Sequence, residues 1–326
     1  MASSGILTIS LDFELYWGVR DHRTLEQYGP NILGVREAIP KILELFQKYG
    51  IHATWATVGF LFFETKEALK AAIPTLLPDY QNKSLSPYLY LDQIGDSEHS
   101  DHYHYAKSLI NKIRQTPNQE IATHTFSHFY CLEPGQSLQD FRADLAAAKK
   151  AAENLDIKIK SLVFPRNQFQ PEYLSACGDA EITCYRGNQD SWLYEARNQE
   201  TESRIRRAVR LLDAYTNLSG HHHYSLKNVQ GPRQMPKNIP ASRFLRPYSR
   251  RLKSFEPMRK RRILSDISSA AKHGEIYHLW WHPHNFGVNL HENLTFLTDI
   301  LEHSACLRAE GRLESLNMGE IAKRHE

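Results

Sequence analysis

The sequence predicts an α/β fold built on parallel strands. Short apolar segments alternate along the 326 residues with longer segments whose apolar positions recur at helical spacing, the order typical of repeated strand–helix–strand units. Connections of this length are right-handed crossovers between parallel strands. Polar side chains also follow several predicted strands directly, where parallel α/β folds place their chemistry.

The composition is that of a globular protein. Apolar residues make up 41%, charged residues 24% and aromatic residues 11%. A net charge of +3, from 40 basic and 37 acidic residues, is too small to favour a polyanionic partner over the whole surface. The four cysteines include no C-x-x-C pair, and neither a leader nor an apolar stretch of about 20 residues is present. We therefore expect a cytoplasmic protein in a reducing compartment.

The first predicted strand covers residues 6–14. Apolar and polar residues alternate along it, so Asp12 and Glu14 emerge on one side at its carboxyl end. Tyr16 and Trp17 follow in a loop that would wall a pocket. A helix over 32–49, stopped by Gly50, leads to a second strand at 51–58.

Residues 64–104 are irregular, and a solvated loop explains their histidines better than a metal site does. A helix over 106–114 then leads to a third strand at 120–123, followed by His124 and His128. On a helical turn these two imidazoles would share a face and supply two of three ligands of a catalytic zinc. In His-Glu-x-x-His metalloproteases the residue after the first histidine is a glutamate that acts as the base, and here that residue is Thr125. A metalloprotease of this type is therefore disfavoured. A chance pair among 17 histidines is the alternative.

Two further strands follow. A helix at 137–155, capped by Ser137 with Asp140 at its third position, precedes a strand at 159–164 that ends near Arg166. The next strand covers 181–186, and a helix is expected over 202–212.

Residues 215–262 lose regular patterning. Within them, 243–262 hold nine lysines and arginines against one acid, Glu256. This basic stretch would meet phosphate or anionic lipid, and a salt-bridged surface helix is an equal alternative.

The last segments are a helix at 263–273, a strand at 275–281 that delivers His282 and His284, a helix at 289–310 and a closing segment at 313–322. Six ionisable residues thus fall at carboxyl ends of predicted strands, which form one rim in a parallel sheet or barrel. They are Asp12, Glu14, His124, His128, Arg166 and His282. Their residue types suit metal-assisted hydrolysis.

These motifs resemble those of the polysaccharide deacetylase family, the group with the NodB homology domain. His124-Thr-x-x-x-His128 is similar to the family's His-Ser/Thr-x-x-x-His zinc motif, and Asp12-Phe-Glu14 stands where the family has Asp-Asp-Gly. Phe164-Pro-Arg166 and Leu279-Trp-Trp-His282 resemble its arginine-bearing segment and its late Leu-x-His strand. The resemblance spans about residues 5–322, with the Asp-x-Glu form of divergent members.

The resemblance implies a distorted (β/α) barrel of about seven parallel strands. It implies one catalytic domain over 1–326, with irregular insertions at about 64–104 and 215–262. By similarity, Asp12 is the base, Arg166 keeps it charged, His282 is the acid, and Glu14, His124 and His128 bind a divalent metal ion, with zinc as the first candidate. The alternatives are the reverse roles for Asp12 and Glu14, and His284 in place of His282.

The implied activity is metal-dependent removal of an N-acetyl group from an amino sugar in a saccharide or saccharide precursor. Without an export signal, a nucleotide- or lipid-linked sugar is favoured over cell-wall polymer. We expect substrate contacts from Tyr16, Trp17, Trp192, Trp281 and His284. Trp280 is a further candidate to stack on a sugar ring, although a late-strand tryptophan is as often core. Hydrolysis of a non-sugar amide, as in allantoinase-like relatives, and a catalytically silent carbohydrate-binding protein are the alternatives. Nucleic-acid binding is disfavoured because the basic charge is confined to one stretch.

Overall fold

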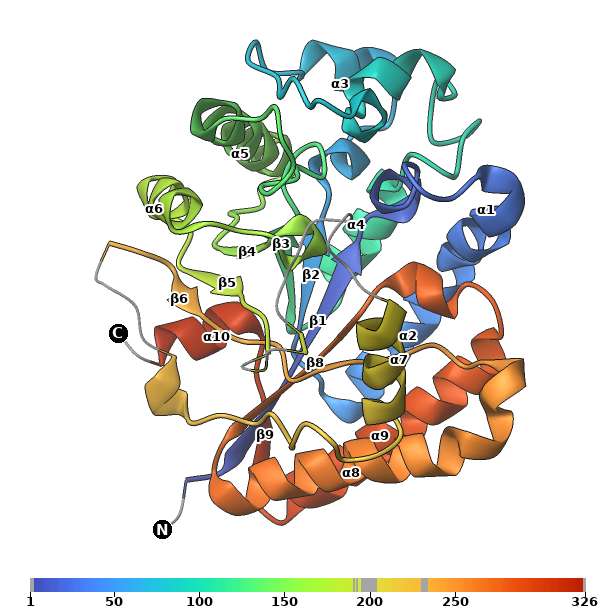
Figure 1. Ribbon diagram of the computed structural model, residues 1–326, viewed down its shortest axis with the longest axis vertical. Coiled ribbons are helices and arrows are strands. Elements are labelled where there is room, and N and C mark those ends of the chain that lie inside the picture. The colour runs from blue at the N-terminus through green and yellow to red at the C-terminus, as the bar shows by residue number, and fades with distance from the viewer. Residues whose placement is uncertain (1–2, 190, 192, 195–203, 230–233, 325–326) are drawn as a thin grey trace.

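A parallel sheet lies at the centre of the computed structural model, with helices packed around it (Figure 1). The structure describes residues 3–189, 191, 193–194, 204–229 and 234–324. Within these residues the sheet has nine strands. They are β1 (Gly5–Phe13), β2 (Ala53–Thr57), β3 (Gln119–Thr123), β4 (Ser161–Val163), β5 (Cys184–Arg186), β6 (Lys237–Asn238), β7 (Arg243–Phe244), β8 (Ile276–Trp281) and β9 (Leu313–Ser315).

The strand order is β6-β5-β4-β3-β2-β1-β8-β7, with β9 added beside the start of β1. Every pairing is parallel. The sheet curls into a barrel that stays open between its two edge strands, β6 and β7, since no pairing joins them in the described part of the chain. The predicted distorted parallel barrel is confirmed, and all carboxyl ends of its strands share one edge.

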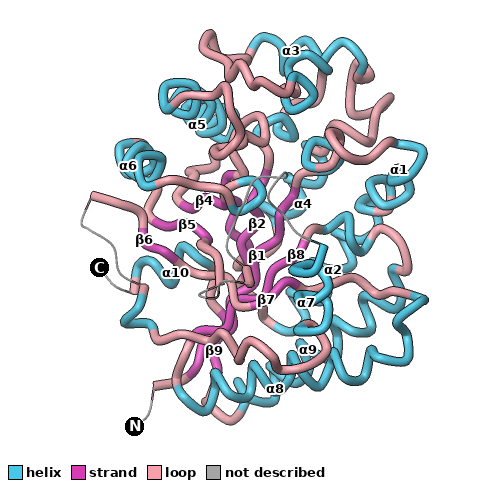
Figure 2. Tube along the Cα trace, in the orientation of Figure 1, coloured by secondary structure: helices cyan, strands magenta, loops and turns pink. Residues whose placement is uncertain are grey.

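Helices surround the strands (Figure 2). They are α1 (Leu25–Leu33), α2 (Val35–Tyr49), α3 (Lys66–Ala71), α4 (Lys107–Gln115), α5 (Leu138–Glu153), α6 (Pro171–Asp179), α7 (Arg204–Asp213), α8 (Glu256–His273), α9 (Leu290–Ala309) and α10 (Met318–Lys323). The prediction missed α1, α3 and α6 and started α8 seven residues late. It was right about α5, where Ser137 and Asp140 form a reciprocal capping box.

The alternation in β1 separates two buried surfaces. Leu7, Ile9 and Leu11 belong to the apolar core between sheet and helices. Ser10 and Asp12 point the other way, because successive side chains of a strand face opposite sides. They too are almost fully buried, at 0% and 3% exposure, so this strand presents polar side chains to the inside of the barrel.

The two irregular insertions hold more structure than expected. The first contains α3 and a buried His104 whose Nδ1 lies 2.7 Å from Asp101. The second contributes β6, β7 and the first turns of α8. Within the described residues, no helix combines the length and the apolar character that a membrane crossing requires.

Much of the basic stretch 243–262 is internal rather than an open patch. Arg243 is 4% exposed and forms ion pairs with Asp213 and Asp266. Arg259 pairs with Glu256, and Arg262 with Asp266. The salt-bridged alternative therefore describes these three arginines better than a lipid-facing surface does.

Candidate active site

A cavity of about 490 Å³ opens at the carboxyl ends of the strands. It is lined by all six residues predicted to share one rim: Asp12, Glu14, His124, His128, Arg166 and His282. Their convergence is confirmed. It follows from the parallel register, in which Asp12 pairs with Ala56 on β2 and Thr57 pairs with Thr123, the residue before His124.

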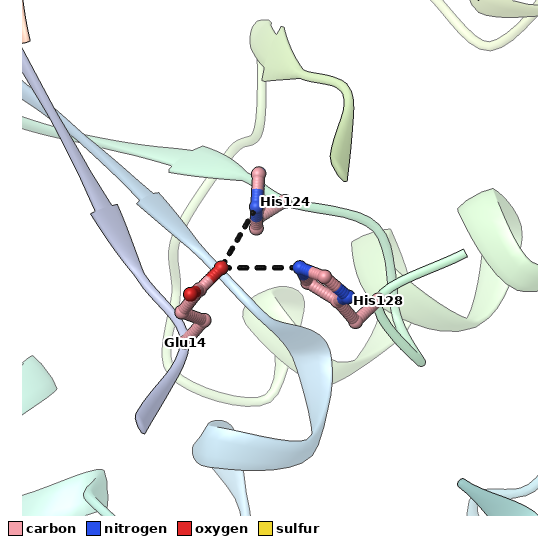
Figure 3. Close-up of side chains that lie close together, drawn as sticks. All are labelled: Glu14, His124 and His128. Atoms are coloured by element: carbon pink, nitrogen blue, oxygen red, sulfur yellow. Dashed lines mark hydrogen bonds and ion pairs between the residues drawn. The ribbon is translucent and has the colours of Figure 1, made fainter. Parts of the chain in front are cut away.

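Glu14 and the two histidines form a buried cluster (Figure 3). Oε2 of Glu14 lies 3.3 Å from Nε2 of His124 and 3.1 Å from Nε2 of His128. The three donor atoms lie within 4.8 Å of one another. Nδ1 of His124 donates to the carbonyl of Val163 at 2.8 Å, which leaves Nε2 as the lone-pair nitrogen facing Glu14.

The electrostatics of this cluster suit a cation. Burial lowers the pKa of His128 to about 4, so its imidazole is neutral at pH 7. Burial alone would raise the pKa of Glu14, but the charge of His282 and the two imidazoles beside the carboxylate bring it well below its usual range. One carboxylate with two imidazoles is a donor set that zinc accepts.

The local structure that brings the histidines together is not the expected helical turn. Residues 124–128 form a loop, in which Thr125 and His128 have φ of 64° and 61°. Asp144 on α5 holds this loop, because its carboxylate accepts the backbone N–H groups of Phe126 at 2.6 Å and Ser127 at 3.1 Å. The helical turn considered for this pair is therefore not formed, and side-chain bonds to the backbone hold the loop instead.

Gly18 makes room for the carboxylate of Glu14. A Cβ atom at position 18 would lie 2.0 Å from Cδ and 2.2 Å from Oε1 of Glu14. Any larger residue would displace the carboxylate from the histidines.

Asp12 is held by Arg186 at the end of β5. Nη1 and Nη2 of Arg186 donate to the two carboxylate oxygens at 2.6 and 2.7 Å. Nη2 also donates to Asn167, and Nη1 to Ser10, both at 3.0 Å. Burial raises the pKa of Asp12, but the charges of Arg186, His124 and His282 and the hydrogen bond from Arg186 together outweigh it, so the net shift is downward.

The predicted pairing of Arg166 with Asp12 is wrong. Arg166 lines the cavity, but its guanidinium bonds to Asp21 and Glu133 and lies 4.1 Å over the ring of Tyr130. The backbone explains this, since Arg166 has φ of 55° in the turn after β4 and leaves the direction of the strand.

His282 and His284 differ in environment. The His282 side chain is 23% exposed, with Nε2 3.8 Å from Asp12 and 3.6 Å from Glu14. His284 is 4% exposed and lies 4.0 Å from Glu14. Burial and the charge of His282 lower the pKa of His284 to about 3. His282 is therefore the better placed of the two to exchange protons with a bound molecule.

Comparison with known proteins finds a matching family. Residues 28–185 match the polysaccharide deacetylase family model. Over this segment, just under half of its length, the chain is similar to the polysaccharide deacetylase family. No curated protein matches the sequence.

Solved structures agree with this family in fold. A polysaccharide deacetylase candidate from Mycobacterium smegmatis superposes with a TM-score of 0.63 at 11% identity, covering 99% of this chain and 91% of that one. Puue allantoinase superposes with a TM-score of 0.54 at 12% identity, covering 98% of this chain and 89% of that one. A GH57-type branching enzyme from Pyrococcus horikoshii superposes with a TM-score of 0.53 at 12% identity, covering 99% of this chain and 70% of that one. At these identities the likeness is one of fold alone.

The match to the polysaccharide deacetylase model includes His124 and His128 and ends one residue before Arg186, whereas Asp12, Glu14 and His282 lie far outside it. Those three join the site through β1 and the segment after β8. Arg186 is the last residue of the strand predicted over 181–186. Its place at a carboxyl end could therefore have made it a second candidate, along with Arg166, for the arginine that pairs with Asp12.

Several predicted substrate contacts are wrong. Tyr16 and Trp17 are 5% and 1% exposed, and they donate to the carbonyls of Arg23 and His104. Trp281 is fully buried and stacks on Phe286. Trp192 lies outside the described residues. His284 does line the cavity.

Trp280, the other tryptophan expected to stack on a sugar ring, does line the cavity, together with Phe244, which the prediction did not select. Their ring centroids are 4.7 Å apart. Strand alternation separates the two tryptophans, because Trp280 lies two residues before His282 and on the same side of the strand, whereas Trp281 faces away.

Proposed function

We propose that this protein is a metal-dependent hydrolase that removes an N-acetyl group from an amino sugar. The main support is the presence in one cavity of a two-imidazole, one-carboxylate donor set beside Asp12, a second carboxylate paired to Arg186. A protein that only binds sugar has no need of this combination.

Glu14, His124 and His128 would hold the divalent ion, with zinc favoured by the donor set. When bound, such an ion polarises the amide carbonyl and lowers the pKa of the attacking water. Asp12 and His282 remain outside this donor set and are available for proton transfer.

Asp12 would act as the general base, because Arg186 keeps its carboxylate charged and able to take the proton of water. Nε2 of His282 would give a proton to the departing nitrogen as the amide C–N bond breaks. The products are acetate and a free amino sugar. The sugar ring would stack on Trp280 and Phe244 at the cavity wall.

Elemental analysis of the purified protein tests the metal directly, with His124→Ala/His128→Ala as the comparison. We expect about one ion per native chain, lost from the double variant, and acetate release from N-acetylglucosamine derivatives only in the native protein. A native protein that holds no transition metal, and takes none up from solution, would contradict the proposal.

The non-sugar amide alternative is tested in the same assay. Small cyclic amides are offered beside N-acetylated saccharides. Turnover of the cyclic amides but not of the N-acetylated saccharides would support hydrolysis of a non-sugar amide instead.

A further inference from the structure

We propose that Arg246 forms an anion-binding subsite of the cavity, so that the preferred amino sugar bears a phosphate or a carboxylate. This inference rests on the proposed function, because it names a substrate class for the same site. It assigns a role to one member of the basic stretch whose charge is not used inside the protein.

The position of Arg246 follows from strand register. Phe244 on β7 pairs with Trp280 on β8, and the N–H of Leu245 donates to the Trp280 carbonyl at 2.7 Å. Continuing this register two residues past β7 and one past β8 sets Arg246 opposite His282, on the side shared by Phe244 and Trp280. All four of these residues line the cavity.

The charge of Arg246 is not balanced by a carboxylate. Three other arginines of the stretch are buried, and each has an acidic partner: Arg243, Arg259 and Arg262. Half-buried Arg246 forms no ion pair with any carboxylate in the described part of the chain. Burial lowers its pKa, the charge of Arg259 lowers it further, and only Tyr215 and Tyr194 act in the opposite direction. Such a guanidinium is stabilised when an anion binds.

Among the described residues, the rest of the cavity offers no competing acid. The carboxylates that line it are Asp12 and Glu14, which are occupied by Arg186 and by the histidines. Arg210 on α7 also lines the cavity, and its pKa is lowered by burial and by the charge of Arg246. A bound anion would relieve this repulsion.

The distance from the reaction centre limits where the anion sits on the substrate. Neighbouring strands lie about 4.8 Å apart, so on the extended register Arg246 is about one sugar ring away from His282. A phosphate on the anomeric oxygen or the carboxylate of a uronic acid on the same ring meets this requirement. Arginine suits both groups because its planar fork binds their oxygens in pairs.

The test compares N-acetylglucosamine, its 1-phosphate and N-acetylglucosaminuronic acid as substrates of the native protein, Arg246→Gln and Arg250→Gln. Arg250 is the matched control, since it is an exposed arginine of the same stretch outside the cavity. We expect at least one anionic substrate to be favoured about ten- to a hundredfold over the neutral sugar, through KM. Arg246→Gln should abolish this preference and Arg250→Gln should keep it. The two anionic substrates distinguish a phosphate from a carboxylate site.

Calorimetric binding of glucosamine 1-phosphate, glucosaminuronic acid and glucosamine separates this inference from the proposed function, because these amines cannot be deacetylated. Tighter binding of either anion, lost in Arg246→Gln and retained in Arg250→Gln, would support the subsite even if no deacetylation were detected. Equal binding of charged and neutral sugars, or anion binding unchanged in Arg246→Gln, would overturn it even in an active deacetylase.

Discussion

Arg186 and Asp12 form a bidentate ion pair inside the barrel, with N–O distances of 2.6 and 2.7 Å. The pair joins β5 to β1, which are separated by three strands in the sheet. Both side chains are buried, at 0% and 4% exposure. Breaking such a pair leaves an uncompensated charge in the interior, so its effect extends to stability as well as to chemistry.

Replacement of Arg186 by Gln should therefore shift the acid limb of the kcat/KM profile to higher pH. Burial raises the pKa of Asp12 and Arg186 lowers it. Removal of Arg186 should therefore raise the pKa of Asp12, so that a larger fraction of the enzyme has a protonated, inactive Asp12 at a given acid pH. The free energy of unfolding should fall by about 3–5 kcal/mol. Arg186→Lys keeps a charge and should shift the profile less.

Arg166→Gln is the comparison that distinguishes the two arginines. Its partners are Asp21 and Glu133, so the acid limb should stay where it is in the native protein. An acid limb displaced by Arg166→Gln but not by Arg186→Gln would contradict the assignment.

His282 and His284 should differ in their response to leaving-group chemistry. If Nε2 of His282 protonates the departing amine, His282→Ala should lower kcat on N-acetyl sugars by about 10²–10⁴-fold. It should lower the hydrolysis of an aryl acetate far less, because phenolate leaves without help. His284 is neutral near pH 7, with a pKa of about 3, so His284→Ala should affect both substrates alike. Equal losses on both substrates for His282→Ala would reject its role as acid.

The sequence predicted the rim of the barrel well and the contacts along it less well. Alternation in β1 correctly gave Asp12 and Glu14 a common side, and parallel strands brought His124 and His282 to the same edge. Which arginine meets Asp12 depends on the turn after β4, where Arg166 and Asn167 have φ of 55° and 53°. Asparagine is enriched in this conformation, but arginine is not, so the sequence did not indicate the direction in which Arg166 leaves the strand.

The missed strands have a different cause. β6 and β7 are two residues long, too short for any periodicity to be visible. They exist because neighbouring strands offer backbone partners, which is a tertiary effect. The position of Arg246 beside His282 depends on β7, so no sequence pattern pointed to it.

The two adjacent tryptophans of β8 should give opposite phenotypes. Trp280 lines the cavity, whereas Trp281 is fully buried against Phe46 and Phe286. Trp281→Ala should lower the free energy of unfolding by about 3–5 kcal/mol, measured by urea denaturation. Trp280→Ala should chiefly raise KM for the sugar. A Trp281 variant with native stability and a raised KM would show that the register is off by one residue.

His278 should make the protein less stable in mild acid. Its Nε2 lies 2.8 Å from the Ser10 hydroxyl, and Nδ1 faces the carbonyls of Ile239 and Pro240 at 3.3 and 3.2 Å. The neutral ring thus donates from Nδ1 and accepts from Ser10. Burial and the charge of Arg186 lower the pKa of His278 from 6.5 to about 3.

Between these two pKa values the unfolded chain binds a proton that the folded chain does not. The contribution of His278 is therefore complete above pH 6.5 and declines as the pH falls toward 3, by about 1.4 kcal/mol per pH unit. His278→Asn keeps a donor near the carbonyls but removes the titration. The free energy of unfolding is measured in urea at pH 7 and at pH 5 for both proteins. Between pH 7 and pH 5 the variant should lose about 2 kcal/mol less of this free energy than the native protein loses. Equal losses for the two proteins would mean that His278 is protonated in the folded state at pH 5, and that the Ser10 bond does not hold it neutral.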